Sequence, residues 1–313
     1  MRILPSTRAF VRESIESKHQ TFFDVLHGYV YGRWVYFYIA VGTREHPLAR
    51  IVAPLYKIVA RLFESRKGGG NHQNINGRKR LTFADTYHGK VVPLDEARKL
   101  VLVNQEIAIH DLEHVIPYAT AREIVLKNPD HIAVMQCPCR SSRDNPCLPL
   151  DVCLIVGEPF ASYALDHHPD RARLITPAEA VEILREEYRR GHVHHAFFKD
   201  AMIGRFYAIC NCCRCCCGAI RAHRDGTPML ASSGYLAEVD HQLCVSCGTC
   251  AKYCQFDAIT YLDGVKNVDA FACMGCAVCV PKCTKGAISM RRESSKPPPL
   301  EIEELMRKAQ VSA

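Results

Sequence analysis

The sequence has no cysteine before Cys137 and only one tryptophan, although it holds 18 cysteines in 313 residues. It also lacks an apolar run that could cross a bilayer. Such a run needs about 20 residues, whereas the uncharged run from Trp34 to Gly42 has 9. No G-x-G-x-x-G motif precedes a predicted helix, so nothing supports a nicotinamide or flavin site. After Met1 comes a polar, charged stretch rather than a signal peptide, which predicts a cytoplasmic protein.

Acidic residues are in the minority, and the formal net charge is +7. The basic excess is concentrated in residues 44–80 and 185–224. Basic charge of this kind can attract nucleic acid, anionic lipid or an acidic redox partner. No helix-turn-helix, RNA-recognition or zinc-finger pattern accompanies it, so we expect no binding to nucleic acid.

The cysteines that are present fall into four groups, within residues 137–153, 210–217, 244–254 and 273–283. Disulfide frameworks belong mainly to short secreted chains. Grouped cysteines in a chain of this length therefore indicate metal binding in a reducing compartment.

The N-terminal part of the sequence, residues 1–67, is predicted to be helical. Residues 22–42 are rich in aromatic side chains, and residues 47–66 carry a basic amphipathic helical pattern that Pro54 would kink. One interpretation is a helix packed on the protein with a solvated basic face. The other is docking of residues 22–66 on a partner or an anionic membrane surface, which would make the protein peripheral on the inner face of the membrane. Residues 68–80, rich in glycine and asparagine, predict a linker.

The middle of the sequence predicts a mixed α/β domain. We expect a helix from Pro93 to Val103, a second over 119–127 that ends at Asn128-Pro129, and a third that Thr176 caps and that runs to about Arg190. We expect strands over 132–135, 152–156 and 206–209, of which the first and last lead into cysteine groups.

The strongest signal is an internal repeat of the spacing C-x2-C-x2-C-x3-C, in which each cysteine recurs 29 residues later, as 273 follows 244. Three such cysteines can wrap one face of a [4Fe–4S] cluster, while the fourth serves the neighbouring cluster. The crossed assignment gives Cys244, Cys247, Cys250 and Cys283 to one cluster, and Cys273, Cys276, Cys279 and Cys254 to the other. The alternative is structural zinc on four-cysteine sites.

These motifs, from Ala237 to Arg291, resemble the bacterial-type two-cluster ferredoxins. The resemblance implies a βαβ pseudo-twofold fold, two [4Fe–4S] clusters and transfer of single electrons at low potential. One departure is visible: the family usually has proline after the fourth cysteine, and this sequence has Gln255 and Thr284 there.

Ten further cysteines have no ferredoxin spacing. Crowded thiols repel one another once ionised unless a metal takes up the charge, although buried inert cysteine is the plain alternative. We expect at least one further iron–sulfur cluster. The ten thiols could hold two cubanes, or one cluster that takes its ligands from both the 137–153 and the 210–217 groups. The first candidate ligands are Cys137, Cys139, Cys147 and Cys153, and the next are Cys210, Cys212, Cys213 and Cys216.

Nearby polar residues admit two interpretations. Arg140 and Arg214 either offset thiolate charge or are plain surface residues. The histidines of Gly-His-Val-His-His, at positions 192, 194 and 195, could ligate iron, but a strand or loop with solvent-facing histidines is favoured. The same holds for His167 and His168. The Cys-x-Cys-Arg and Cys-Asn-Cys-Cys-x-Cys-Cys-Cys-Gly patterns resemble uncharacterised multi-cluster ferredoxin-like proteins from anaerobic metabolism, which implies electron transfer and nothing more specific.

The sequence thus predicts an α+β protein with a helical N-terminal segment (1–67), a cysteine-rich α/β domain (81–234), a two-cluster ferredoxin domain (235–292) and a peripheral C-terminal tail (293–313). We expect an electron-transfer protein that works with a redox partner or within a larger oxidoreductase complex. Alternatives are an iron–sulfur redox enzyme with a substrate-accessible cluster, for example for disulfide reduction, and a membrane-docked electron-transfer subunit.

Overall fold

A computed structural model describes residues 3–17, 20–50, 86–110, 112–118, 123–262 and 265–312. Its helices and strands are mixed, as the predicted α+β class requires. The predicted helix over 47–66 and the linker over 68–80 lie largely or wholly outside the described residues.

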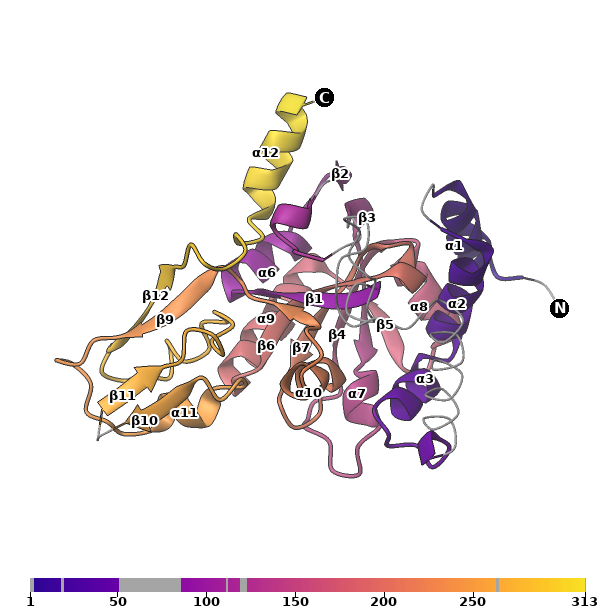
Figure 1. The fold of residues 1–313 in the computed structure, drawn as a ribbon. Helices are drawn as coiled ribbons and strands as arrows, with labels where there is room; N and C mark the ends of the chain where they lie inside the picture. Colours follow the sequence, from indigo (N-terminus) through magenta and orange to yellow (C-terminus); the bar gives the residue numbers. More distant parts are fainter. Residues whose placement is uncertain are drawn as a thin grey trace, which may run out of the picture.

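A central eight-stranded sheet organises the middle of the chain (Figure 1). The strands follow the order β2-β3-β4-β7-β6-β1-β8, and β5 pairs with β3. All of these pairings are antiparallel except that of β1 with β8. The strands are β1 (Tyr87–Val92), β2 (Ile107–Ile109), β3 (Ile124–Gln136), β4 (Asp151–Glu158), β5 (Ala172–Ile175), β6 (Val193–Lys199), β7 (Arg205–Cys212) and β8 (Leu230–Ala231).

Each face of this sheet has its own buried core because side chains alternate along a strand. On β3, Ile132 and Val134 join one core, and Ala133 and Met135 join the other. The first core is covered by α6 (Leu94–Val101), α9 (Pro177–Arg190) and α12 (Ile302–Ser312). The second is covered by α1 (Pro5–Glu16), α2 (Phe22–Arg33), α3 (Val35–Gly42), α8 (Phe160–His167) and α10 (Gly218–Arg224).

The helix α9 begins where the sequence predicts. The backbone N–H of Glu179 donates to the Thr176 hydroxyl at 3.2 Å, Pro177 occupies the first turn, and Gly191 ends the helix with a φ of 90°. The Glu179 carboxylate pairs with Arg173 instead of closing a capping box. The helix over 94–101 and the strands over 132–135, 152–156 and 206–209 are also confirmed.

Two expectations for local structure are wrong. Residues 124–127, which lie within the expected helix over 119–127, belong to β3, where 124–126 pair with β2 and Lys127 pairs with Glu158 of β4. Ile124 and Leu126 both face the core, so tertiary burial overrides helix propensity there. The C-terminal helix is not peripheral either, because Leu300, Ile302 and Leu305 are buried in the core beside α6.

The last part of the chain forms a separate small unit beside the sheet. Strand β9 (Tyr235–Val239) pairs with β12 (Ile288–Arg292), and β10 (Ile259–Leu262) pairs with β11 (Val265–Val268). One short helix, α11 (Thr249–Tyr253), lies between β9 and β10. This unit, orange in Figure 1, and the indigo helices α1–α3 lie on opposite sides of the sheet. Among the described residues, no helix is long and apolar enough to span a bilayer.

Candidate iron–sulfur sites

The unit from β9 to β12 contains two cavities lined by cysteine. Cys254, Cys273, Cys276 and Cys279 line one, which we call the inner ferredoxin cavity. Cys244, Cys247, Cys250 and Cys283 line the other, the outer ferredoxin cavity. The structure therefore gathers the thiols of each crossed set around a common space, with the fourth cysteine of each motif in the cavity of the other motif.

The repeat extends to the backbone around the fourth cysteines. The N–H of Ala258 donates to Cys254 Sγ at 3.3 Å, and the N–H of Ala287, 29 residues later in the chain, donates to Cys283 Sγ at 3.2 Å. Such N–H donors stabilise the thiolate form. The two fourth cysteines therefore accept the same backbone hydrogen bond, which suits both of them to bind a metal.

The two cavities differ in their contact with water. Phe256, Met274 and Val278 close the inner cavity, and burial raises the pKa of Cys279 to about 12. Lys282 and Lys285 line the outer cavity, where Cys247 is exposed. A buried thiol with a raised pKa becomes a thiolate when a metal takes up its charge.

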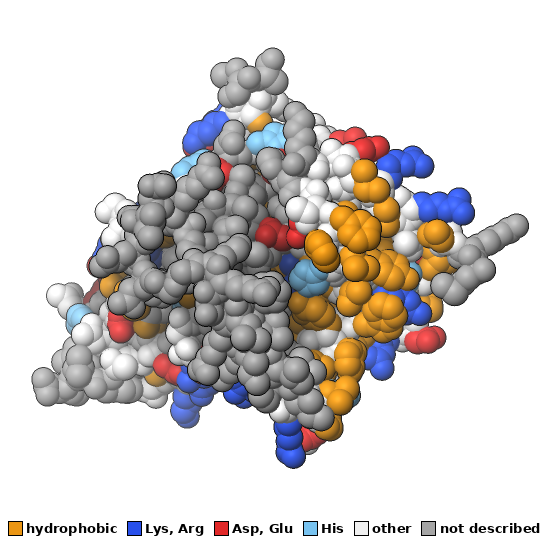
Figure 2. Space-filling view, turned by 45° about the vertical axis from the view of Figure 1, so that its right-hand side comes forward, with side chains coloured by type: hydrophobic (Ala, Val, Ile, Leu, Met, Phe, Trp, Pro, Cys, Tyr) orange, Lys and Arg blue, Asp and Glu red, His pale blue; other side chains and the backbone are white. Residues whose placement is uncertain are grey.

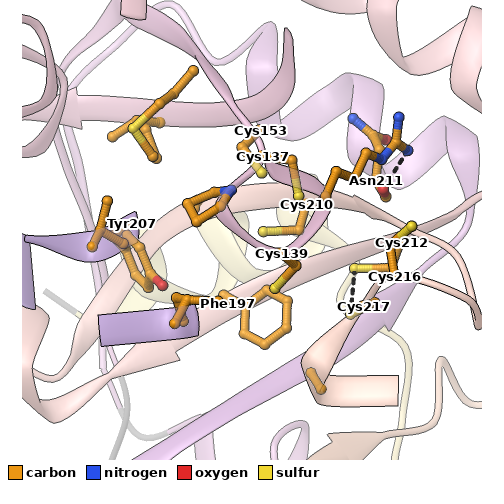
Figure 3. A pocket seen from close by; sticks show the side chains of 18 of the residues that line it. Cys137, Cys139, Cys153, Phe197, Tyr207, Cys210, Asn211, Cys212, Cys216 and Cys217 are labelled. Carbon is orange, nitrogen blue, oxygen red and sulfur yellow. Dashed lines mark hydrogen bonds between the residues drawn. The ribbon is translucent and has the colours of Figure 1, made fainter. Parts of the chain in front are cut away.

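A third cavity lies against the central sheet, and we call it the sheet cavity (Figure 3). Six cysteines line it that do not belong to the compact group described below: Cys137, Cys139, Cys153, Cys210, Cys212 and Cys217.

Strand pairing brings these six cysteines together. Met135 pairs with Cys153 across β3 and β4, which places Cys137 just beyond the end of β3 near Cys153. Leu154 pairs with Ile209 across β4 and β7, so Cys210 follows on the neighbouring strand. Cys139 lies on the short helix α7 (Pro138–Ser141), and Cys212 and Cys217 lie at the end of β7 and before α10.

The thiols of the sheet cavity are close enough to interact. Cys217 Sγ lies 3.2 Å from Cys212 Sγ. Hydrogen bonds with Cys137 and Cys210, together with burial, raise the pKa of Cys153 well above its ordinary value. Hydrogen bonds with Cys139 and Cys212 instead lower the pKa of Cys137 and that of Cys217. The six cysteines are therefore not equivalent as free thiols, whereas a cluster would bind its ligands as thiolates.

Arg140 is a buried cation at the wall of the sheet cavity and not a surface residue. It is 1% exposed, and its Nη2 lies 2.5 Å from Glu187 Oε2. The same nitrogen donates to the backbone oxygen of Asn211 at 3.0 Å. Its Nε is buried and has no hydrogen-bond partner among the described residues. Arg140 also lines the sheet cavity. Its unpaired N–H is therefore suited to donate a hydrogen bond to a sulfur atom of a bound cluster.

Arg214 is different, because its side chain is half exposed and pairs with Asp257 at 2.5 Å. The plain-surface interpretation is therefore wrong for Arg140, while Arg214 makes a surface ion pair that joins the middle of the chain to the ferredoxin unit.

The expectation of solvent-facing histidines is also wrong. His192, His194 and His195 are all buried, and the last two lie on β6. His194 Nδ1 donates to Asn211 Oδ1 at 2.6 Å. Burial lowers the pKa of His194 to about 4 and that of His195 to about 3, so both rings are neutral near pH 7. His167 and His168 are half-buried against α1 and α2, where they contact Thr7 and the backbone of Gly32.

The remaining four cysteines of the middle region form a compact group. The Sγ atoms of Cys147, Cys213, Cys215 and Cys216 all lie within 4.8 Å of one another. The structure thus separates Cys147 from the three cysteines with which the sequence grouped it. Cys215 and Cys217 were missed as candidates, although the C-x2-C spacing of Cys213 and Cys216 could have drawn attention to that turn.

Comparisons with known proteins support only part of this picture. Residues 237–260 match the family model of the 4Fe-4S binding domain, a range that contains the first cysteine motif. A search of curated proteins and a search of solved structures each find no match. The chain therefore carries a 4Fe–4S binding motif together with a cysteine-rich middle region. The second motif, from Cys273 to Cys283, lies outside the matched range.

Proposed function

We propose that this protein is a multi-cluster electron carrier. It would pass single electrons between two ferredoxin-type [4Fe–4S] clusters, in the inner and outer cavities, and at least one further cluster in the sheet cavity. A bound cluster of this type supplies a one-electron couple. The observation that carries the proposal is a continuous buried contact between the inner ferredoxin cavity and the sheet cavity.

Three rings make this contact. Phe256 lines the inner cavity, and its ring centroid lies 6.5 Å from that of His195. His195 in turn lies 5.8 Å from Phe197, which lines the sheet cavity. All three are buried, and the two phenylalanines belong to one core with Cys212 and Cys217. Water is therefore excluded from the space between the two cavities, and their separation is fixed by packing.

Polar contacts hold the ferredoxin unit in this position. The Gln255 side chain donates to the Gly191 oxygen and accepts from the Arg214 backbone N–H, both at 2.8 Å. Tyr188 donates to the Ala277 oxygen at 2.8 Å. Proline at position 255 could make neither of the glutamine contacts, so the departure from the ferredoxin pattern has a structural role in docking.

The three cavities also suggest an order. The inner cavity adjoins the sheet, and the outer cavity lies beyond it with Cys247 at the surface. Val245, which is 60% exposed, lines the outer cavity together with Cys247. An exposed apolar side chain beside an exposed ligand suits a redox partner or a larger oxidoreductase complex. Electrons would then enter or leave at the outer cavity.

Metal analysis tests the proposal. Anaerobically purified protein is expected to hold about twelve irons or more with matching acid-labile sulfide, because two [4Fe–4S] clusters account for about eight. The double variant Cys137→Ala/Cys212→Ala is expected to fall to about eight irons and to keep the EPR signals of the ferredoxin clusters. A wild-type content of about eight irons, or no loss in the variant, would remove the sheet-cavity cluster from the proposal.

The N-terminal helices favour a second element of the function, docking on an anionic membrane surface. Figure 2 shows apolar side chains gathered on one face of the molecule. On α2, Phe22 and Phe23 are 76% and 77% exposed. On and near α3, Trp34 and Phe37 are about half exposed, and Arg33 and Arg44 lie nearby in the chain. Apolar side chains with adjacent basic residues are typical of an interfacial helix.

Liposome flotation checks this docking. The full-length protein is expected to float with vesicles that contain phosphatidylserine, and Phe22→Ser/Phe23→Ser is expected to weaken partitioning by at least about tenfold, since each buried phenylalanine contributes about 1.5–3 kcal/mol. Phe271→Ser is the matched control, because it removes an exposed phenylalanine from the opposite side of the molecule. Equal flotation of the two variants would speak against a role for α2.

A further inference from the structure

We propose that Cys147, Cys213, Cys215 and Cys216 bind a single metal ion, zinc or iron, in a tetrahedral site separate from the iron–sulfur clusters. The first support is the spacing of the sulfur atoms. Sγ of Cys215 lies 3.0 Å from that of Cys147, 3.2 Å from that of Cys213 and 3.8 Å from that of Cys216. A tetrahedral ion with metal–sulfur bonds of about 2.3 Å places its sulfurs about 3.8 Å apart.

This spacing argues against a cubane. In a [4Fe–4S] cluster each thiolate binds a different iron, and the whole cluster lies between the four sulfurs. The ferredoxin cysteines of this chain accordingly surround open cavities. Among the described residues, only the group of Cys147 is compact enough for all four ligand atoms to reach one ion. The 3.0 Å contact is also far longer than a disulfide bond of about 2.0 Å.

The local backbone prepares these sulfurs for a cation. Cys213 and Cys216 have the C-x2-C spacing common in zinc sites. The backbone N–H of Cys147 donates to Cys216 Sγ at 3.5 Å. Donors of this kind stabilise thiolates, as do the outer-shell contacts of known metal sites. Four sulfur ligands with no nitrogen or oxygen select zinc or iron over magnesium or calcium.

The position of the site indicates what the ion would do. It joins the loop that holds Cys147 to the turn from Cys213 to Cys216, and Arg143 reinforces the junction by donating to the Cys216 oxygen at 3.2 Å. Both segments are flanked by cysteines of the sheet cavity, and Cys213 and Cys216 form part of its wall. A closed set of four ligands leaves no position for substrate. The ion would therefore fix the wall of the sheet cavity and bind no substrate there.

The wild-type protein provides the first test. Mass spectrometry of metals and assay of acid-labile sulfide, both on anaerobic protein, are expected to give one metal ion per chain beyond the irons matched by sulfide. Zinc is identified directly, and a mononuclear iron–thiolate site is identified by its EPR and Mössbauer spectra. A metal content that equals sulfide, with no zinc, would overturn the proposal.

Variants locate the ion. Cys215→Ser, at the exposed ligand, and Cys147→Ser/Cys215→Ser are expected to lose that one ion while iron and sulfide of the clusters stay unchanged. Cys137→Ala/Cys212→Ala is the matched control and is expected to keep it. A wild-type content of about sixteen irons, with loss of about four irons and about four sulfides in Cys147→Ser/Cys215→Ser, would show a cubane instead. Two fewer free thiols in the denatured wild-type protein, with no extra metal, would show a disulfide. Either result rejects the single-ion site and leaves the proposal of a cluster in the sheet cavity unaffected.

Discussion

Replacement of Glu187 by glutamine is expected to destabilise the folded protein by about 3–5 kcal/mol, because it leaves the charge of Arg140 buried without a counter-ion. Both side chains are 1% exposed, and they are in direct contact. His192 also donates to Glu187, and its hydrogen bond and the charge of Arg140 outweigh burial and lower the pKa of the Glu187 carboxyl. The carboxylate thus balances one buried cation at the wall of the sheet cavity.

The effect should be seen as a shift of the unfolding midpoint in denaturant, followed by circular dichroism of the anaerobic holoprotein. Glu186→Gln is the matched control on the same helix, because Glu186 pairs with the exposed Arg189. Exposed pairs contribute only about 0–1 kcal/mol, so this control should change the midpoint little. Equal midpoints for the two variants would contradict the prediction.

A double variant separates the charge from the packing. Arg140→Met/Glu187→Leu removes both charges and keeps most of the buried volume, and it is expected to recover much of the stability lost in Glu187→Gln. Its cluster content is then informative. Loss of the sheet-cavity irons with recovered stability would show that Arg140 supports the cluster and not only the fold.

The grouping of the cysteines of residues 244–283 around two cavities could be anticipated from the sequence, because these cysteines are close together in the chain. Motifs of eleven residues, such as 244–254, hold three ligands of one set and the fourth of the other, and the 29-residue repeat relates the two. A local motif of this kind does not depend on how distant strands pair. The two ferredoxin cavities therefore follow the sequence closely.

The sites of the middle region could not be predicted in the same way. Cys153 and Cys210 come together only because β4 pairs with β7 in one register, and a shift by one residue would turn Cys210 to the other face. Cys147 is only six residues from Cys153 in the chain, yet its loop carries it to the turn of Cys213. Proximity in the sequence therefore suggested the wrong neighbours for Cys147.

The buried histidines were mispredicted for a related reason. The pattern Gly-His-Val-His-His appears polar, but His194 and His195 lie on β6 between two paired strands. Their burial depends on the sheet, which brings Asn211 opposite His194 and Cys210 opposite His195. Local polarity carries no information about this tertiary pairing.

The last prediction concerns the crossed ligand sets, and it has the largest expected effect on iron content. The variant Cys254→Ala/Cys279→Ala removes two ligands of the inner cavity and is expected to lose about four irons, the content of one cluster. The variant Cys250→Ala/Cys254→Ala removes one ligand from each cavity and is expected to lose about eight. Both variants contain Cys254→Ala, and the substitutions that differ are matched, because Cys250 and Cys279 are 5% and 8% exposed.

Iron and sulfide analysis with EPR spin quantification distinguishes the two assignments. If each motif instead held its own cluster, Cys250→Ala/Cys254→Ala would lose about four irons and Cys254→Ala/Cys279→Ala about eight. The geometry favours the crossed result, because Cys254 lines the cavity of Cys273, Cys276 and Cys279. Since Phe256 lies two residues beyond Cys254 and contacts His195, the crossed set also places one ligand of the inner cluster directly beside the contact with the sheet cavity.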